Sequence, residues 1–215
     1  MIQADQPTIS VPAPGVWCPA VTFFDSVTDE LDIPSQSKYY KYLSESGLTG
    51  LVILGTNAET FLLTREERAA LIKCARDSVA PDYPLMAGVG GHSTKQVLEY
   101  ISDAAEAGAN YILLLPCAYF GPATSETVIR NFYAQVAEKS PLPIVLYNFP
   151  GVCNGVDLSS SLIASLAAAH PNIVGVKLTC GSVGKITRLA ALLPASRFSV
   201  YGGQSGESSP ANPPF

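Results

Sequence analysis

The sequence predicts an α/β protein whose parallel sheet is covered by helices, and it favours a (β/α)8 barrel over an open doubly wound sheet. Two observations support this. Short, almost continuously apolar runs alternate with longer segments of helical periodicity, which is typical of parallel strands buried on both faces. No G-x-G-x-x-G follows the first run, and the glycines of "GVGGHS" at 88–93 have the wrong spacing for that dinucleotide-binding motif. Spacing alone leaves the doubly wound sheet open as an alternative.

Seven apolar runs are candidate strands. They span residues 15–24, 50–54, 84–90, 110–116, 143–149, 172–178 and 198–203. The clearest helical spacing between them occurs over 64–80, 93–109 and 125–140, and each of these segments opens with Ser or Thr in a capping position. The chain therefore repeats a strand followed by a helix.

The length of the chain bounds the domain organisation. A chain of 215 residues, 47% of them hydrophobic, can bury one sizeable core. We expect an N-terminal extension at 1–14, one barrel domain at 15–203, and a disordered tail at 204–215, which is rich in Ser, Pro and Gly. Because a barrel of this kind commonly takes about 250 residues, we expect one that is truncated after about its seventh strand.

Composition excludes several kinds of partner. A net charge of −5 with 14% charged residues does not suit nucleic-acid binding. Five cysteines without a C-x-x-C pair fit neither a disulfide framework nor a zinc site, so we interpret them as reduced thiols in an intracellular protein. The first residues lack the features of a signal or transit peptide, and the run "YILLLP" is too short to span a membrane. We therefore expect a soluble, cytosolic protein.

The stretch "NIVGVKLTCG" at 172–181 places Lys177 in an otherwise apolar strand. Its aliphatic stem could simply pack while the ammonium reaches the surface. Burial, however, disfavours the charged form of an amine, and a neutral amine can attack a ketone to form a Schiff base. In a barrel, chemistry occurs where the strands end, so the second interpretation depends on other polar groups at the same mouth.

Two other strand ends supply such groups. Tyr147 ends the fifth run in "IVLYNFP" and could transfer protons, although alone it would be an ordinary amphipathic tyrosine. Gly55, Thr56 and Asn57 follow the second run in "VILGTNAET" and could bind a carboxylate, although the same residue types are common in turns. The combination of an amine, a phenol and an anion cradle favours an active site.

Five motifs carry a family resemblance. "GTNAE" with "LTREER", "GVGGHST", "YNFPG" and "GVKLTCG", in this order, resemble the dihydrodipicolinate synthase / N-acetylneuraminate lyase family of pyruvate-dependent class I aldolases, from about residue 15 to about residue 203. The resemblance implies a (β/α)8 barrel and a homo-oligomer. It also implies that Lys177 forms a Schiff base with a 2-keto acid, that Tyr147 relays protons and that Thr56 and Asn57 hold the carboxylate, without a metal or organic cofactor.

Departures from the family pattern indicate the substrate. In the synthases of this family an arginine grips the second substrate at the position of Val152, so a 4-hydroxy-tetrahydrodipicolinate synthase-like activity is the less favoured alternative. "GTNAE" and "LLPCAYFG" are more similar to 4-hydroxy-2-oxoglutarate aldolases and 2-keto-3-deoxy sugar-acid aldolases. A relay tyrosine of the family is replaced by Ala118, and Tyr119 beside it is the candidate substitute.

The resulting hypothesis is a Schiff-base lyase. It would reversibly cleave a 4-hydroxy-2-keto acid to pyruvate or glyoxylate and an aldehyde or keto acid. The candidate catalytic residues are Lys177, Tyr147 and Tyr119, and the candidate substrate-binding residues are Gly55, Thr56, Asn57 and Gly202. No metal site is expected, since His92 and His170 lack ligand spacing. Two alternatives are an inactive truncated paralogue that associates with full-length subunits, and a doubly wound protein in which the lysine is inert.

Overall fold

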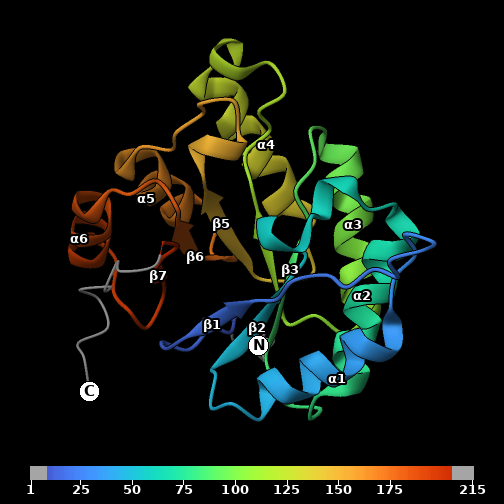
Figure 1. The fold of residues 1–215 in the computed structure, drawn as a ribbon. Coiled ribbons are helices and arrows are strands. Elements are labelled where there is room, and N and C mark those ends of the chain that lie inside the picture. Colours follow the sequence, from blue (N-terminus) through green and yellow to red (C-terminus); the bar gives the residue numbers. More distant parts are fainter. Residues whose placement is uncertain (1–8, 205–215) are drawn as a thin grey trace, which may run out of the picture.

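The computed structural model describes residues 9–204, which form one seven-stranded sheet with six α-helices around it (Figure 1). The strands are β1 (Trp17–Pro19), β2 (Gly50–Ile53), β3 (Leu85–Gly88), β4 (Tyr111–Leu114), β5 (Ile144–Asn148), β6 (Ile173–Leu178) and β7 (Ser199–Gly202). The helices are α1 (Ile33–Ser44), α2 (Arg65–Ser78), α3 (Thr94–Glu106), α4 (Glu126–Lys139), α5 (Ser160–Ala169) and α6 (Val183–Leu192). Residues 1–8 of the predicted extension and 205–215 of the predicted tail lie outside the described residues.

The order of the strands decides between the two predicted α/β architectures. Each strand pairs in parallel with the next one along the chain, so the sheet order is β1 to β7 without a reversal. A doubly wound sheet would reverse its order at a switch point. The barrel prediction is therefore confirmed, and the doubly wound alternative is wrong.

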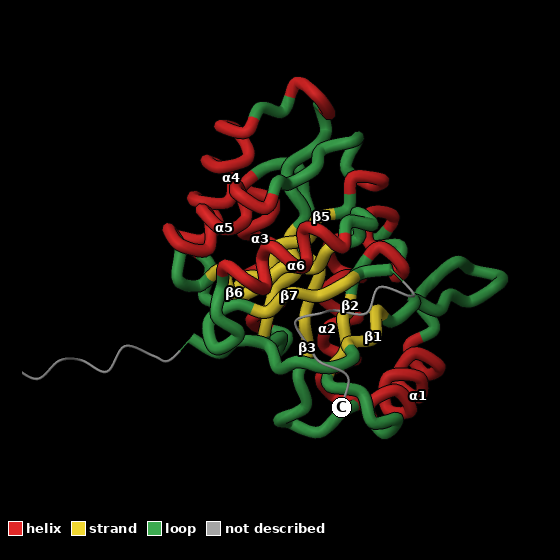
Figure 2. Tube along the Cα trace, turned by 90° about the vertical axis from the view of Figure 1, so that its left-hand side faces the viewer, coloured by secondary structure: helices red, strands yellow, loops and turns green. Residues whose placement is uncertain are grey.

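The sheet curls strongly, as the tube view shows (Figure 2). In a flat sheet with strands about 4.8 Å apart, β1 and β7 would be about 29 Å from each other. Instead, the ring centroid of Trp17 in β1 lies 6.4 Å from that of Tyr201 in β7 and 5.9 Å from that of Tyr111 in β4. Within the described part of the chain β1 and β7 are the two edges of this curled sheet. The ends of the strands therefore face a common mouth.

Local sequence signals explain where the helices start. Thr64 begins α2 with a capping box, in which its side chain accepts from the Glu67 amide while the Glu67 carboxylate accepts from the Thr64 amide. Ser93 and Ser125 cap α3 and α4 through their hydroxyls. None of the helices within residues 9–204 is long and apolar enough to cross a membrane.

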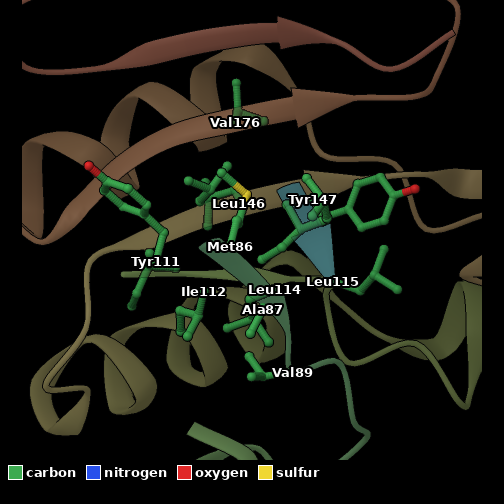
Figure 3. Close-up of a cluster of buried hydrophobic side chains, with 14 of the residues drawn as sticks. Met86, Ala87, Val89, Tyr111, Ile112, Leu114, Leu115, Leu146, Tyr147 and Val176 are labelled. Carbon is green, nitrogen blue, oxygen red and sulfur yellow. The ribbon is translucent and has the colours of Figure 1, made fainter. Parts of the chain in front are cut away.

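The core fills the space inside the sheet and between the sheet and its helices. All residues of β2 to β5 are buried, as the apolar runs predicted. Figure 3 shows part of this core, with Tyr111 and Tyr147 at opposite ends of the cluster. Since Tyr147 is near the end of β5, the Tyr147 side of the cluster is the side of the mouth.

Candidate active site

The strand register brings the predicted amine and phenol together. Tyr147 of β5 pairs with Lys177 of β6, and Lys177 pairs with Tyr201 of β7. Paired residues in a parallel sheet project their side chains from the same face. Accordingly, the Lys177 Nζ lies 4.6 Å from the centroid of the Tyr147 ring.

The Lys177 ammonium is largely buried and makes none of the ion pairs found within the described residues. Burial lowers the pKa of this lysine from 10.5 to about 8, because the charged form is deprived of water. With that pKa, Lys177 is a neutral amine in roughly a tenth of the molecules at pH 7. An ordinary lysine is neutral in well under about a thousandth of them. The site therefore supplies a nucleophile near neutral pH.

The Tyr147 phenol is positioned by a hydroxyl from another strand end. Tyr147 is only 4% exposed, and its Oη lies 3.3 Å from the Thr56 Oγ1. Burial raises the pKa of the phenol, and the nearby hydroxyls of Thr56 and Thr179 oppose the rise. A phenol that stays protonated and is linked to a second hydroxyl can pass a proton in either direction.

The predicted anion cradle is a single helical turn after β2. Residues Thr56–Ala58 form a 3₁₀ turn, with Gly55 in the capping position and Thr56 partly buried, while Asn57 is exposed. The first N–H groups of a helical turn have no acceptor within it, so those of Thr56 and Asn57 can bind a carboxylate.

The backbone just before this cradle is strained. Leu54 has a φ of 61°, a left-handed conformation that is costly for a leucine. A Cβ on Gly88 of the neighbouring β3 would lie 1.9 Å from the Leu54 carbonyl oxygen, so only glycine fits there. This close approach packs the Leu54 carbonyl against β3 at the point where the chain leaves β2, just before the cradle.

One further polar residue was missed by sequence reasoning. Thr179 is 8% exposed, and its hydroxyl has no well-formed hydrogen bond within the described part of the chain. The hydroxyl lies close enough to the Tyr147 phenol to lower its pKa, so it belongs with Thr56 among the hydroxyls around that phenol. Its position two residues after Lys177, hence on the same side of an extended strand, was the available signal.

The remaining predicted residues divide between two places. Gly202 is the last residue of β7 and pairs with Leu178, so it lies at the mouth. Tyr119 is 69% exposed, and its ring centroid lies 5.7 Å from that of His92 and 5.2 Å from that of Phe120. With His92 and Phe120 it lines a cavity of about 710 Å³ beside α3 and α4. The structure thus groups Thr56, Tyr147 and Lys177 but does not bring Tyr119 to them.

Curated relatives resemble the chain over most of its length. It is 69% identical over 195 residues to a Coccidioides immitis protein that carries the provisional name of a mitochondrial 4-hydroxy-2-oxoglutarate aldolase, covering 91% of this chain and 62% of that one. An Emericella nidulans protein with the same kind of provisional name is 41% identical, over 88% and 62% of the two chains. An L-threo-3-deoxy-hexylosonate aldolase of Aspergillus niger is also 41% identical, over 85% and 56%.

Solved structures also resemble the chain over most of its length. A dihydrodipicolinate synthase family protein from Coccidioides immitis, itself provisionally assigned, matches with a TM-score of 0.86 and 66% identity, over 91% of this chain and 62% of that one. A prophage protein of the same family from Escherichia coli K12, in complex with pyruvate, matches with a TM-score of 0.81 and 32% identity, over 88% and 63%. The chain thus spans less than two thirds of the length of these relatives.

These comparisons correct one expectation and establish the family. The expected cytosolic location is wrong, because the similar proteins of Coccidioides immitis and Emericella nidulans bear names that place them in the mitochondrion. The profile of the dihydrodipicolinate synthetase family matches residues 13–211, which is most of the sequence. With the 69% identity and the parallel barrel arrangement, this match shows that the chain belongs to the dihydrodipicolinate synthetase family.

Proposed function

We propose that the chain carries the site of a class I aldolase that cleaves a 4-hydroxy-2-keto acid. The observation that carries the proposal is the largely buried Lys177 amine, which lies 4.6 Å from the ring of Tyr147. The aldolase names of the similar fungal proteins support the same reaction class. The candidate substrates are 4-hydroxy-2-oxoglutarate and a 2-keto-3-deoxy sugar acid.

The first step is formation of the imine. The neutral Lys177 Nζ attacks the C2 carbonyl of the substrate. The resulting carbinolamine takes up one proton, relayed from solvent through the Thr56 and Tyr147 hydroxyls, and loses water to give a protonated imine. The N–H groups and hydroxyl of the Thr56 turn hold the C1 carboxylate beside it. The protonated imine then serves as the electron sink that the bond cleavage requires.

The second step is cleavage of the C3–C4 bond. Tyr147 Oη accepts the proton of the C4 hydroxyl while it passes its own proton toward Thr56 Oγ1 or the substrate carboxylate. The electrons of the C3–C4 bond enter the imine, so the aldehyde leaves and an enamine remains. Protonation at C3 and hydrolysis by one water then release pyruvate and restore the amine. With 4-hydroxy-2-oxoglutarate the leaving aldehyde is glyoxylate.

Two residues favour cleavage over synthase-like condensation. Val152, which is 41% exposed beyond the end of β5, offers no charge to grip a second carboxylic substrate. The Thr179 hydroxyl lies beside the Tyr147 phenol and offers it a second hydroxyl neighbour for the proton transfer of an aldol cleavage. We also propose a mitochondrial location, on the names of the fungal relatives, and a homo-oligomer, on the family resemblance.

Borohydride trapping tests the proposal directly. The full chain is incubated with pyruvate and sodium borohydride, and its intact mass is measured beside Lys177→Ala and a control, Lys73→Ala, at an exposed lysine. We expect one reduced pyruvate on the wild type and the control, and none on Lys177→Ala. Release of pyruvate from the two candidate substrates is then compared. A folded wild-type chain without an adduct would contradict the proposal and favour an inactive paralogue.

A further inference from the structure

A second lysine is buried behind the candidate site. Lys185 is 8% exposed and lies in the first turn of α6. A cation is disfavoured there, both by the helix dipole and by the loss of water. The Lys185 ammonium is paired with the carboxylate of Asp157, which belongs to the segment between β5 and α5. This ion pair therefore ties α6 to the segment that follows the Tyr147 strand.

The ion pair is extended by a fully buried asparagine. The same Asp157 Oδ1 accepts a hydrogen bond of 2.8 Å from Asn148 Nδ2. Asn148 Oδ1 accepts from the Leu158 N–H at 2.9 Å, and the Asn148 carbonyl accepts from the Thr179 N–H at 2.9 Å. Asn148 is 0% exposed, so its end of each of these bonds is shielded from water, whereas the Asp157 side chain is 47% exposed.

This network lies next to the reacting groups without facing them. Asn148 follows Tyr147 in β5 and pairs with Leu178, which follows Lys177 in β6. Successive side chains of a strand point to opposite faces, so Asn148 projects away from the face that carries Tyr147 and Lys177. The network therefore does not touch the reacting groups, and it fixes where the two strand ends lie.

We propose that Asp157 and Lys185 are positioning residues for imine formation. Their ion pair anchors Asn148, which in turn fixes the end of β5 and the Thr179 backbone relative to each other. The inference rests on the proposed function, because it concerns the approach of pyruvate to the Lys177 amine beside Tyr147. An error of about 1 Å in such geometry can slow a reaction by up to about a hundredfold.

The test measures the single-turnover rate of imine formation in the full chain, by borohydride quenching and intact mass. We expect Lys185→Met and Asp157→Ala each to lower the rate at saturating pyruvate about tenfold. The half-saturating pyruvate concentration and the midpoint of the pH profile should stay unchanged. The double variant should be no slower than either single variant, because the two residues act as one unit. Lys185→Arg should recover most of the rate, since it keeps the charge.

Two control variants separate positioning from general stability. Lys73→Met breaks an exposed ion pair with Asp77 in α2 and should leave the rate unchanged. Val136→Ala removes buried volume from α4 and should lower the melting temperature without slowing the imine step at a temperature where the protein is folded.

Three results would overturn the inference. They are an unchanged rate in Lys185→Met, an equal slowing by Val136→Ala, and additive effects in the double variant. Each of these can be seen only if the wild type forms the imine, so they leave the proposed function intact. A wild-type chain that forms no imine would instead overturn both proposals.

Discussion

At the scale of single residues, the lowered pKa of Lys177 makes a prediction about pH. Only the neutral amine attacks a carbonyl, so the rate of imine formation should rise with pH and level off once the amine has lost its proton. Because burial lowers the pKa to about 8, we expect the midpoint of the rise near pH 8. An exposed lysine would have its midpoint near 10.5. Borohydride quenching of the reaction with pyruvate, repeated across this pH range, measures the midpoint.

The Tyr147→Phe variant is the matched comparison for this profile. It removes the phenol that transfers protons but keeps the ring that covers the amine. The rate should fall, while the midpoint should stay near that of the wild type, because burial is the cause of the lowered pKa. A wild-type midpoint at about 10 or above would show that the amine is hydrated and would contradict this account.

At the scale of elements, α2 holds two of the loops around the mouth through Arg68. The guanidinium of this buried residue donates two hydrogen bonds to Thr60 Oγ1, at 3.1 and 2.8 Å, and one of 3.3 Å to the Gly90 carbonyl. It also stacks 4.1 Å from the centroid of the Tyr100 ring. Thr60 follows the Thr56 turn, and Gly90 follows β3. One side chain therefore joins the turn just after the anion cradle to the loop that follows β3.

Removal of these Arg68 contacts, which together form the Arg68 clamp, should lower the free energy of unfolding. Arg68→Met leaves a buried hydroxyl and a buried carbonyl without their donor, so we expect a loss of about 2–3 kcal/mol in the free energy of unfolding, measured with urea. Arg68→Lys should recover little, because an ammonium lacks the planar fork of a guanidinium. Arg188→Met, at an exposed arginine that donates a hydrogen bond to Ser160, should cost less than about 0.5 kcal/mol. Equal losses in the two Met variants would refute the clamp.

At the scale of the whole molecule, the sequence predicted what is local and missed what depends on long-range pairing. Apolar runs located the strands, and Ser or Thr caps located α2 to α4, because both signals lie within a few residues. Lys177 and Tyr147 could be linked because parallel strands end at one edge. The ion pair of Asp157 with Lys185 joins residues 28 apart, and only the fold brings them together. The cellular location depends on targeting signals that other proteins recognise, so the overall composition did not reveal it.

The ends of the curled sheet are joined by the segment before β1. Tyr201 of β7 directs its Oη to the carbonyls of Pro12 and Ala13, at 3.0 and 2.9 Å, and Ser199 donates to the same Pro12 carbonyl at 2.7 Å. The Tyr201 ring also contacts Trp17 of β1. Pro12 and Tyr201 lie near the two ends of the described residues, and they meet here. The stability of this contact therefore reports how firmly the two edges of the curled sheet are held together.

Tyr201→Phe should weaken this junction in a pH-dependent way. Loss of the phenol oxygen should cost about 1–2 kcal/mol of unfolding free energy at about pH 8. Burial raises the pKa of Tyr201 to about 12 from 10, so its stabilising contribution is complete below pH 10 and is lost as the pH rises toward 12. The difference between wild type and variant should therefore shrink at about pH 11. Urea unfolding followed by the fluorescence of Trp17, the single tryptophan, measures it, with Tyr42→Phe at an exposed tyrosine as the control. A difference that is constant with pH would mean that the phenol is not buried at the junction, and the two ends of the sheet would then be held by apolar contact alone.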